Sequence, residues 1–228
     1  MQLLKGFTEC VGAEIELLDE GLYHCKWIHL SRSGSGLDIS GPGELVGPIV
    51  EVVNALPKVG QVALVLSGRG VLSRSLETAG EGVKGQQVFQ TAFPGVAAEE
   101  FYTQHLFQQP RSFISIARKQ LVDPLLGKLE SAGIGVLSLS LGPAVGVHLL
   151  EQIFDEDREV EFNGYRFLKN EKNELAEMEK LAVVTEIGPI KIGEVEIPSD
   201  CAFAYSAGLQ LLLGGALVEV KADVPILS

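Results

Sequence analysis

The sequence predicts an α/β fold with a mixed sheet, on three observations. Residues 111–141 have the pattern of a strand, a helix and a second strand. Residues 11–39 have the pattern of three short strands joined by turns, and an apolar helical stripe over 44–56 follows them. Residues 61–67 are almost all apolar, which is typical of a strand in the middle of a sheet.

The strand-helix-strand pattern is the strongest local signal. Its first strand follows Pro110. Its helix is predicted from apolar residues three and four positions apart, which are Leu121, Val122, Leu125, Leu126 and Leu129. Gly133 suits the C′ position that ends the helix, and residues 136–141 form the second strand. Pro124 leaves two alternatives: a helix that begins near Arg118 and bends, or a shorter one capped by Asp123.

Further strands, turns and helices are predicted along the rest of the first two thirds of the chain. Strands are predicted at 11–18, 22–30 and 37–39, with a turn at 19–21 and a loop at 31–36. Gly41-Pro42-Gly43 interrupts the chain before the helix at 44–56, which ends at 57–60. A turn at 68–70 leads into a strand at 71–77, and the glycine-rich segment 78–86 is predicted to be a loop. A helix is predicted to start within 94–100, before a strand at 101–107.

The last third differs in composition. Residues 151–180 hold ten acidic and five basic side chains. Asn163-Gly164, between residues 160–162 and 165–167, is typical of a type I′ hairpin. Further short strands are predicted within 181–195. Ser199 or Asp200 is predicted to cap a helix that runs to Leu213 and stops at Gly214.

Charge and length exclude several classes of function. The 228 residues include 18 basic and 30 acidic side chains, which leaves a net charge of −12. The charge therefore argues against nucleic acid as a partner, because phosphate backbones are bound by clustered lysine and arginine. The uncharged runs 133–150 and 201–218 are interrupted by polar and turn residues, so buried core is the better interpretation than membrane insertion.

The cysteines and the N-terminal residues favour a cytoplasmic protein. The three cysteines are odd in number and far apart in sequence, which argues against a disulfide framework. The first residues have no apolar core or cleavage site of a signal peptide.

No familiar catalytic or metal-binding motif is present. His24, Cys25 and His29 are interpreted as ordinary strand residues, because Cys25 and His29 would lie roughly 13 Å apart on one strand face. The run 41–47 has GxGxxxG spacing and is better explained as a turn and a helix start. His105 and His148 lack an evident serine or cysteine partner in the sequence and are interpreted as structural. We therefore expect no metal site.

Four stretches resemble the actin-like proteins of bacterial inner-membrane assembly platforms, namely the pilus-assembly M proteins and the cytoplasmic part of the type II secretion L protein. They are VALVLSGRGVL (62–72), ISIARKQLV (114–122), LESAGIGVLSLSLGP (129–143) and IPSDCAFAYSAG (197–208). The resemblance implies a ribonuclease H-like, actin-type fold. Its first half would be 1–150, with an inserted α+β subdomain at about 70–142, and 151–228 would be a reduced second half.

The departures from this family bear on activity. Active members carry an Asp-x-Gly turn in the first hairpin, where the glycine lets backbone N–H groups approach phosphate. The resemblance places Glu14-Ile15-Glu16 at those positions, with Ser67 and Gly68 completing a vestigial nucleotide cleft. Two carboxylates there would repel phosphate, and no second Asp-x-Gly loop is present. ATP and Mg²⁺ are therefore disfavoured, and no cofactor is expected.

The resulting hypothesis is a non-catalytic cytoplasmic scaffold at the periphery of the inner membrane, within a pilus or type II secretion-like platform. The alternatives are a reduced actin-like nucleotide-binding ATPase and a structural protein without a small ligand. Partners would be other platform proteins, and self-association is left open. Their predicted docking surface is a set of basic residues in the middle third of the chain: Arg69, Arg74, Arg111, Arg118 and Lys119. The competing interpretation is that these residues only solvate turns and helix ends.

Overall fold

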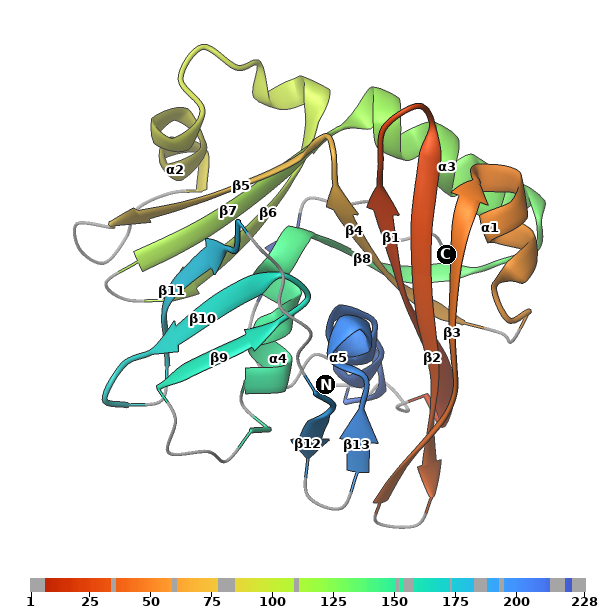
Figure 1. Ribbon diagram of the computed structural model, residues 1–228. Coiled ribbons are helices and arrows are strands. Elements are labelled where there is room, and N and C mark those ends of the chain that lie inside the picture. Colours follow the sequence, from red (N-terminus) through yellow and green to blue (C-terminus); the bar gives the residue numbers. More distant parts are fainter. Residues whose placement is uncertain are drawn as a thin grey trace, which may run out of the picture.

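A five-stranded mixed sheet organises the first part of the chain. The computed structural model describes residues 7–33, 36–58, 61–77, 85–108, 111–150, 152–153, 158–172, 174–182, 188–192, 195–213 and 220–222. In spatial order the strands of this first sheet are β3 (Gly36–Pro48), β2 (Leu22–Ser33), β1 (Glu9–Leu17), β4 (Val62–Gly68) and β8 (Val136–Leu141). β1, β2 and β3 are antiparallel, whereas β4 is parallel to β1 and β8 to β4 (Figure 1). The predicted mixed sheet is confirmed.

Helices cover both faces of the first sheet. α1 (Ile49–Ala55) and α3 (Lys119–Ser131) pack on one face, and α5 (Ala202–Leu212) packs on the other (Figure 1). The predicted stripe of α3 is buried at Val122, Leu125, Leu126 and Leu129. Pro124 lies inside α3, which begins at Lys119, so the alternative of a shorter helix capped by Asp123 is wrong. Gly133 has a φ of 77°, as a C′ glycine should.

The prediction of a helix over 44–56 is wrong in its first part. Residues 44–48 belong to β3, which pairs with β2 as far as the Leu22–Pro48 pair. Leu45 fits the helical stripe in sequence, yet it reaches the same core from a strand. The Gly41-Pro42-Gly43 signal therefore marks an irregular part of a long strand instead of a break, and it accompanies a register shift at 27–29 of β2. A side chain at Gly43 would overlap the indole of Trp27.

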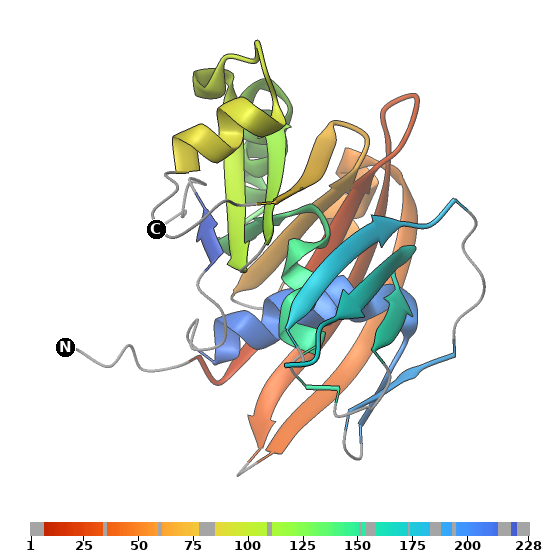
Figure 2. The same ribbon diagram turned by 90° about the vertical axis from the view of Figure 1, so that its left-hand side faces the viewer.

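A second sheet has four strands. In order they are β14 (Val220–Ala222), β6 (Phe101–Gln108), β7 (Arg111–Arg118) and β5 (Val71–Glu77). α2 (Gly85–Ala92) covers one face (Figure 2), so the predicted loop 78–86 is wrong at residues 85–86; residues 78–84 lie outside the described residues. Within 94–100 only one turn of 3₁₀ helix forms, η1 (Ala98–Glu100).

The strand-helix-strand segment joins the two sheets. β7 lies in the second sheet and β8 in the first, so the interpretation of residues 111–141 as a βαβ-like unit holds along the chain and not within one sheet. β8 continues into η2 (Gly142–Gly146) and α4 (Val147–Leu150). No helix in the described part of the chain is both long and apolar enough to cross a membrane.

Two small sheets complete the fold. One contains β11 (Leu175–Lys180), β10 (Tyr165–Lys169) and β9 (Glu159–Phe162), and the other pairs β12 (Ile190–Ile192) with β13 (Val195–Ile197). Asn163 and Gly164 have φ values of 50° and 72°, which confirms the predicted hairpin turn. The 3₁₀ turn η3 (Ser199–Cys201) precedes α5, and the N-cap position of α5 is Cys201, so the predicted cap position at Ser199 or Asp200 is one or two residues too early. Gly214 lies outside the described residues.

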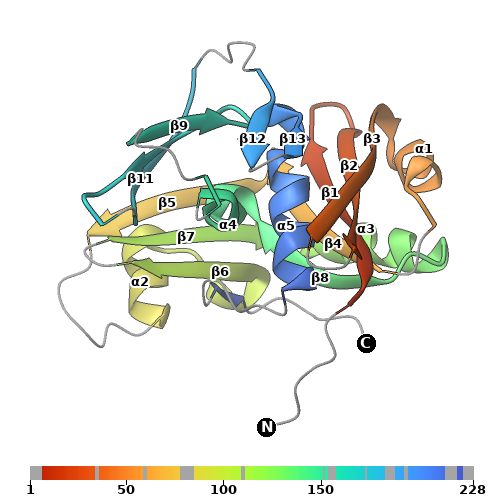
Figure 3. The ribbon, with the colours of Figure 1, turned by 90° about the horizontal axis from the view of Figure 1, so that it is seen from below.

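An aromatic core joins the β9–β11 sheet to α5. The ring centroids of Phe162 and Phe167 are 4.4 Å apart, and Phe203 of α5 meets Phe162 edge-on at 5.9 Å. These three side chains are fully buried in the same cluster as Ile28 and Leu30 of the first sheet. α5 therefore lies between the first sheet and the β9–β11 sheet, as Figure 3 shows from below.

Candidate functional site

One face of the first sheet is divided into an apolar half and a polar half. Cross-strand pairing places Cys10, Gly12 and Ile28 on the same face of the sheet as Glu14 and Lys26. α5 covers the apolar half at very close range. A side chain at Gly12 would overlap the carbonyl of Ala204, so the helix backbone rests directly on β1. The polar half lies beyond the N-terminal end of α5.

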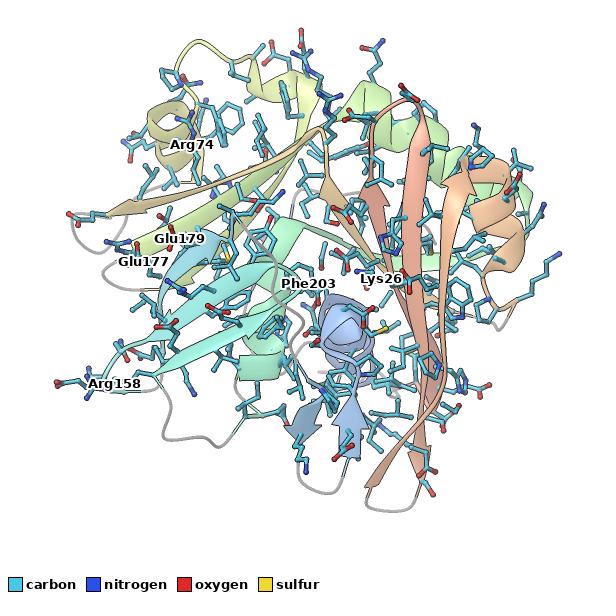
Figure 4. The ribbon with its side chains drawn as sticks, in the orientation of Figure 1. Lys26, Arg74, Arg158, Glu177, Glu179 and Phe203 are labelled. Carbon is cyan, nitrogen blue, oxygen red and sulfur yellow. The ribbon has the colours of Figure 1, made fainter. Side chains whose placement is uncertain are left out.

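The polar half forms one wall of a cleft, and the β9–β11 sheet forms the other. Its lining residues are Glu14, Glu16, Lys26, Ser67, Gly68, Asn163, Gly164, Tyr165, Lys180, Ser199 and Asp200. Figure 4 shows Lys26 on β2 and Phe203 on α5 in this part of the molecule. The four residues predicted for a vestigial nucleotide cleft, Glu14, Glu16, Ser67 and Gly68, are thus brought together.

Glu14 is the buried centre of the cleft. Its side chain is 5% exposed. The hydroxyl of Ser67 donates to Glu14 Oε1 at 2.7 Å, and the amide of Asn163 donates to Oε2 at 2.7 Å. Burial raises the pKa of Glu14 to about 7, although the Ser67 hydrogen bond, the charge of Lys26 and the Asn163 hydrogen bond oppose the rise. Glu14 is therefore partly protonated near neutral pH.

Asn163 connects three segments that are far apart in sequence. Besides bonding Glu14, its amide nitrogen donates to the carbonyl of Asp200 at 3.1 Å. Its amide oxygen accepts from the backbone N–H of Phe203 at 3.2 Å, which satisfies an N–H in the first turn of α5. The turn residue thus joins the β9–β10 hairpin to β1 and α5. We call Glu14, Ser67 and Asn163 the polar clamp.

His24 lies between two glutamates, Glu16 on β1 and Glu44 on β3. His24 Nδ1 is 3.7 Å from Glu16 Oε2, and its Nε2 is 2.6 Å from Glu44 Oε1. Cys25 is buried on the opposite face, among the residues packed against α1 and α3, and His29 lies near Glu9. His24, Cys25 and His29 therefore do not converge. Among the described residues no group of acids, histidines and cysteines is arranged to hold a metal ion.

The resemblance misplaced the turn of the first hairpin. Glu14 and Glu16 lie within β1, where they pair with Lys26 and His24. The turn itself is Asp19-Glu20-Gly21, in which Glu20 and Gly21 have φ values of 58° and 75°. The first hairpin therefore does contain an Asp-x-Gly turn, and Asp19 there forms an ion pair with Arg69.

The predicted basic docking surface is not one patch. Arg111 and Arg118 occupy opposite ends of β7. Each of the five basic residues is also engaged locally. Arg69 pairs with Asp19, Arg74 donates to the carbonyl of Ala92, Arg111 approaches Glu77 and Glu177, Arg118 approaches Glu100, and Lys119 lies over the Tyr102 ring.

Sequence reasoning missed the residues of the cleft that come from the second half of the chain. Asn163 was assigned only to a turn, and Lys180 and Asp200 had no role beyond charge and a helix cap. The available signal was the Asn-Gly turn itself, because the side chain of its asparagine is free to bond other segments.

His148 is buried without a hydrogen-bond partner for either ring nitrogen within the described residues.

Comparison with solved structures gives a structural similarity at low sequence identity. No protein-family model matches the sequence, and no curated protein matches it. Among solved structures, the chain is similar to the cytoplasmic domain of EpsL, an inner membrane component of the type II secretion system of Vibrio cholerae. The TM-score is 0.44 at 12% identity, over 75% of this chain and 71% of that one. A similarity of this size assigns neither fold nor function.

Proposed function

We propose that the protein is a non-catalytic scaffold that binds other proteins of a pilus or type II secretion-like assembly platform at the inner membrane. The proposal treats the chain as a reduced actin-type fold with the division at residue 150 and the insertion at about 70–142 that the sequence resemblance implies. It also holds that the cleft binds no nucleotide. The sequence resemblance suggests an assembly platform as the setting, and the polar clamp argues against catalysis.

The polar clamp supports the proposal because the protein's own groups fill the centre of the cleft. Glu14 accepts from Ser67 and Asn163, and Asn163 uses its remaining amide groups on η3 and α5. A phosphate at this point would have to displace these bonds and would face Glu14 and Glu16. The cleft has a volume of about 190 Å³. Ligand pockets of small molecules typically measure roughly 300–1,000 Å³. The residues present therefore do not fit ATP with Mg²⁺.

The alternative function is a reduced nucleotide-binding ATPase. The Asp19-Glu20-Gly21 turn favours this alternative, because it has the Asp-x-Gly sequence pattern in the first hairpin. Lys26 and Lys180 in the cleft lining also favour an anionic ligand. Against it, the Asp19 carboxylate pairs with Arg69.

Calorimetry of the full chain with Mg-ATP separates the two functions. We expect no micromolar binding and no release of inorganic phosphate. Micromolar binding that Lys26→Ala abolishes and Lys191→Ala leaves intact would establish the ATPase instead, because Lys191 is exposed on β12 and pairs with Glu196. Affinity capture from the source cell should in turn recover proteins of an inner-membrane assembly platform, and their absence would contradict the scaffold function.

A further inference from the structure

A second groove, which we call the edge groove, runs along the outer edge of β5. The five consecutive residues from Val71 to Ser75 line it. Successive side chains of a strand point to opposite faces, so a groove lined by all five follows the edge of the strand and not one face. Within the described strands, β5 pairs only with β7. Its outward N–H and C=O groups are therefore available to a further strand.

The opposite wall of the edge groove is a face of side chains. Tyr165, Met178 and Lys180 line it from β10 and β11. They share one face, because Tyr165 pairs with Lys180 across the two strands, and Met178 lies two residues before Lys180. A strand added to β5 would lay one set of its side chains on Tyr165 and Met178. The other set would lie beside Leu72, which is 53% exposed.

The charge of the edge groove is opposite to that of the protein. Arg74 and Lys180 line it, and no carboxylate is among its described lining residues, although the chain carries a net charge of −12. Arg74 is held against the Phe93 ring, whereas Lys180 forms no ion pair within the described part of the chain. An acidic side chain opposite Lys180 would therefore be complementary.

Arg111 fixes the length of the edge groove. Its guanidinium is 3.9 Å from Glu77 of β5 and 3.6 Å from Glu177 of β11, so it bridges the two walls at one end. Figure 4 shows Glu177 on β11 and Arg74 beside α2. The open stretch from Val71 to Ser75 corresponds to roughly 16 Å of strand. A β5 strand from a second copy would bring its own α2 and β11 with it, so a single extended segment is the better occupant.

We propose that the edge groove binds an extended segment of a partner protein by strand addition to β5. The segment has about five residues, with alternating apolar side chains and an acidic side chain opposite Lys180. This inference rests on the proposed scaffold function and names its docking site.

Selection from a display library of nine-residue linear peptides on the immobilised full chain tests this assignment. Enriched peptides should alternate apolar residues and carry an acidic residue near one end. Synthetic labelled copies are then N-methylated at odd or at even backbone positions, and binding is measured by fluorescence anisotropy. N-methylation at one of the two sets of positions should abolish binding, and N-methylation at the other set should leave binding nearly unchanged. Only alternate backbone groups of an added strand face the neighbouring strand.

Variants of the protein locate the bound peptide. Lys180→Glu should weaken binding about tenfold through charge repulsion, and the matched control Lys191→Glu should not. Leu72→Asp should abolish binding by placing a charge on the strand edge. Thermal unfolding monitors that each variant remains folded. If no peptide is enriched, or if binding ignores both N-methylation patterns and Lys180→Glu, the edge groove is not the site.

Two further results separate this inference from the scaffold function. A concentration-dependent dimer in ultracentrifugation that Leu72→Asp disperses would make a second copy the occupant and overturn the inference. If Lys180→Glu and Leu72→Asp still capture platform proteins, the scaffold function stands and the edge groove is wrong. If peptides bind in the groove but the unmodified chain captures no platform protein, the groove stands and the scaffold function fails.

Discussion

The two halves of one sheet face are closed in different ways. Over Ile28 and Leu30, α5 packs directly on the strands, and Gly12 removes the side chain that would hold it away. Over Glu14, a single turn residue, Asn163, closes the same face by hydrogen bonds. The apolar half therefore depends on contact and volume, and the polar half depends on every buried polar group having a partner.

This difference indicates where the protein tolerates change. Because α5 and β1 pack backbone on backbone, there is no room between them for even one methyl group. A substitution that adds volume in the apolar half therefore displaces the whole of α5. A hydrogen-bonded clamp loses only the bonds that a substitution removes. The two halves should therefore respond differently to substitution.

The largest effect is expected in the apolar half. Gly12→Ala should destabilise the protein by about 3 kcal/mol or more, because the new methyl group overlaps the Ala204 carbonyl. Urea unfolding measures the loss. Gly127→Ala in α3 is the control, since a side chain there would meet no atom within 4 Å. It should stabilise by up to about 1 kcal/mol through helix propensity. Equal effects of the two substitutions would contradict the close packing.

The next effect concerns the charge of Glu14. Its folded-state pKa of about 7 lies above the ordinary 4.5, so the folded state binds more protons than the unfolded state between those values. Stability should therefore fall as pH rises from about 4.5 to 7. Glu14→Gln removes this loss and should stabilise the protein at pH 8 by about 2 kcal/mol, with little change at pH 4.5. Urea unfolding at both pH values measures the change in the free energy of unfolding. An equal change at both pH values would exclude a titrating Glu14.

A smaller loss is expected at the other side of the polar clamp. Asn163→Gly keeps the positive φ of the turn but removes the amide that serves Glu14, Asp200 and Phe203. We expect destabilisation of about 1–2 kcal/mol at neutral pH. In the Glu14→Gln background the loss should shrink, because a neutral partner depends less on the lost bond. A double-mutant cycle measures this coupling, and strict additivity would show that Asn163 and Glu14 act separately.

Much of the fold follows from local pattern, and the failures have identifiable causes. The strands over 61–67, 71–77 and 136–141 and the hairpin turn at Asn163 follow from apolar runs and turn chemistry, which are local properties. The helix over 44–56 is wrong in its first part because pairing with β2 outweighs the apparent helical stripe at Leu45. α2 was missed because a glycine-rich segment hides its start, although Val88, Phe89 and Ala92 carry helical spacing.

The candidate site could be predicted only in part, for a different reason. The resemblance grouped Glu14, Glu16, Ser67 and Gly68, and these residues line one cleft because they lie on strands that are adjacent in the sheet. Asn163 and Asp200 reach the cleft through tertiary packing across more than 140 residues from Glu14, which no local pattern records. The basic residues were grouped by sequence proximity alone, and β7 separates Arg111 from Arg118 by its whole length.

The smallest effect is expected at the rim of the polar half, and it bears on the remaining alternative function. Asp19 joins the first hairpin turn to the β4–β5 turn through Arg69, but the two side chains are 66% and 75% exposed. An exposed ion pair contributes little, so Asp19→Asn should change stability by less than about 0.5 kcal/mol. Asn also tolerates the turn, which leaves the backbone of β1 and β2 in place. A scaffold should therefore be unaffected in both unfolding and partner capture.

If Asp19 instead contacted a bound nucleotide, the same substitution would abolish an Mg-ATP binding signal that the unmodified chain displays. It would leave the melting temperature unchanged. Calorimetry and thermal unfolding on this one variant thus separate a residual nucleotide site from a surface turn in which the Asp19 side chain forms a solvated ion pair.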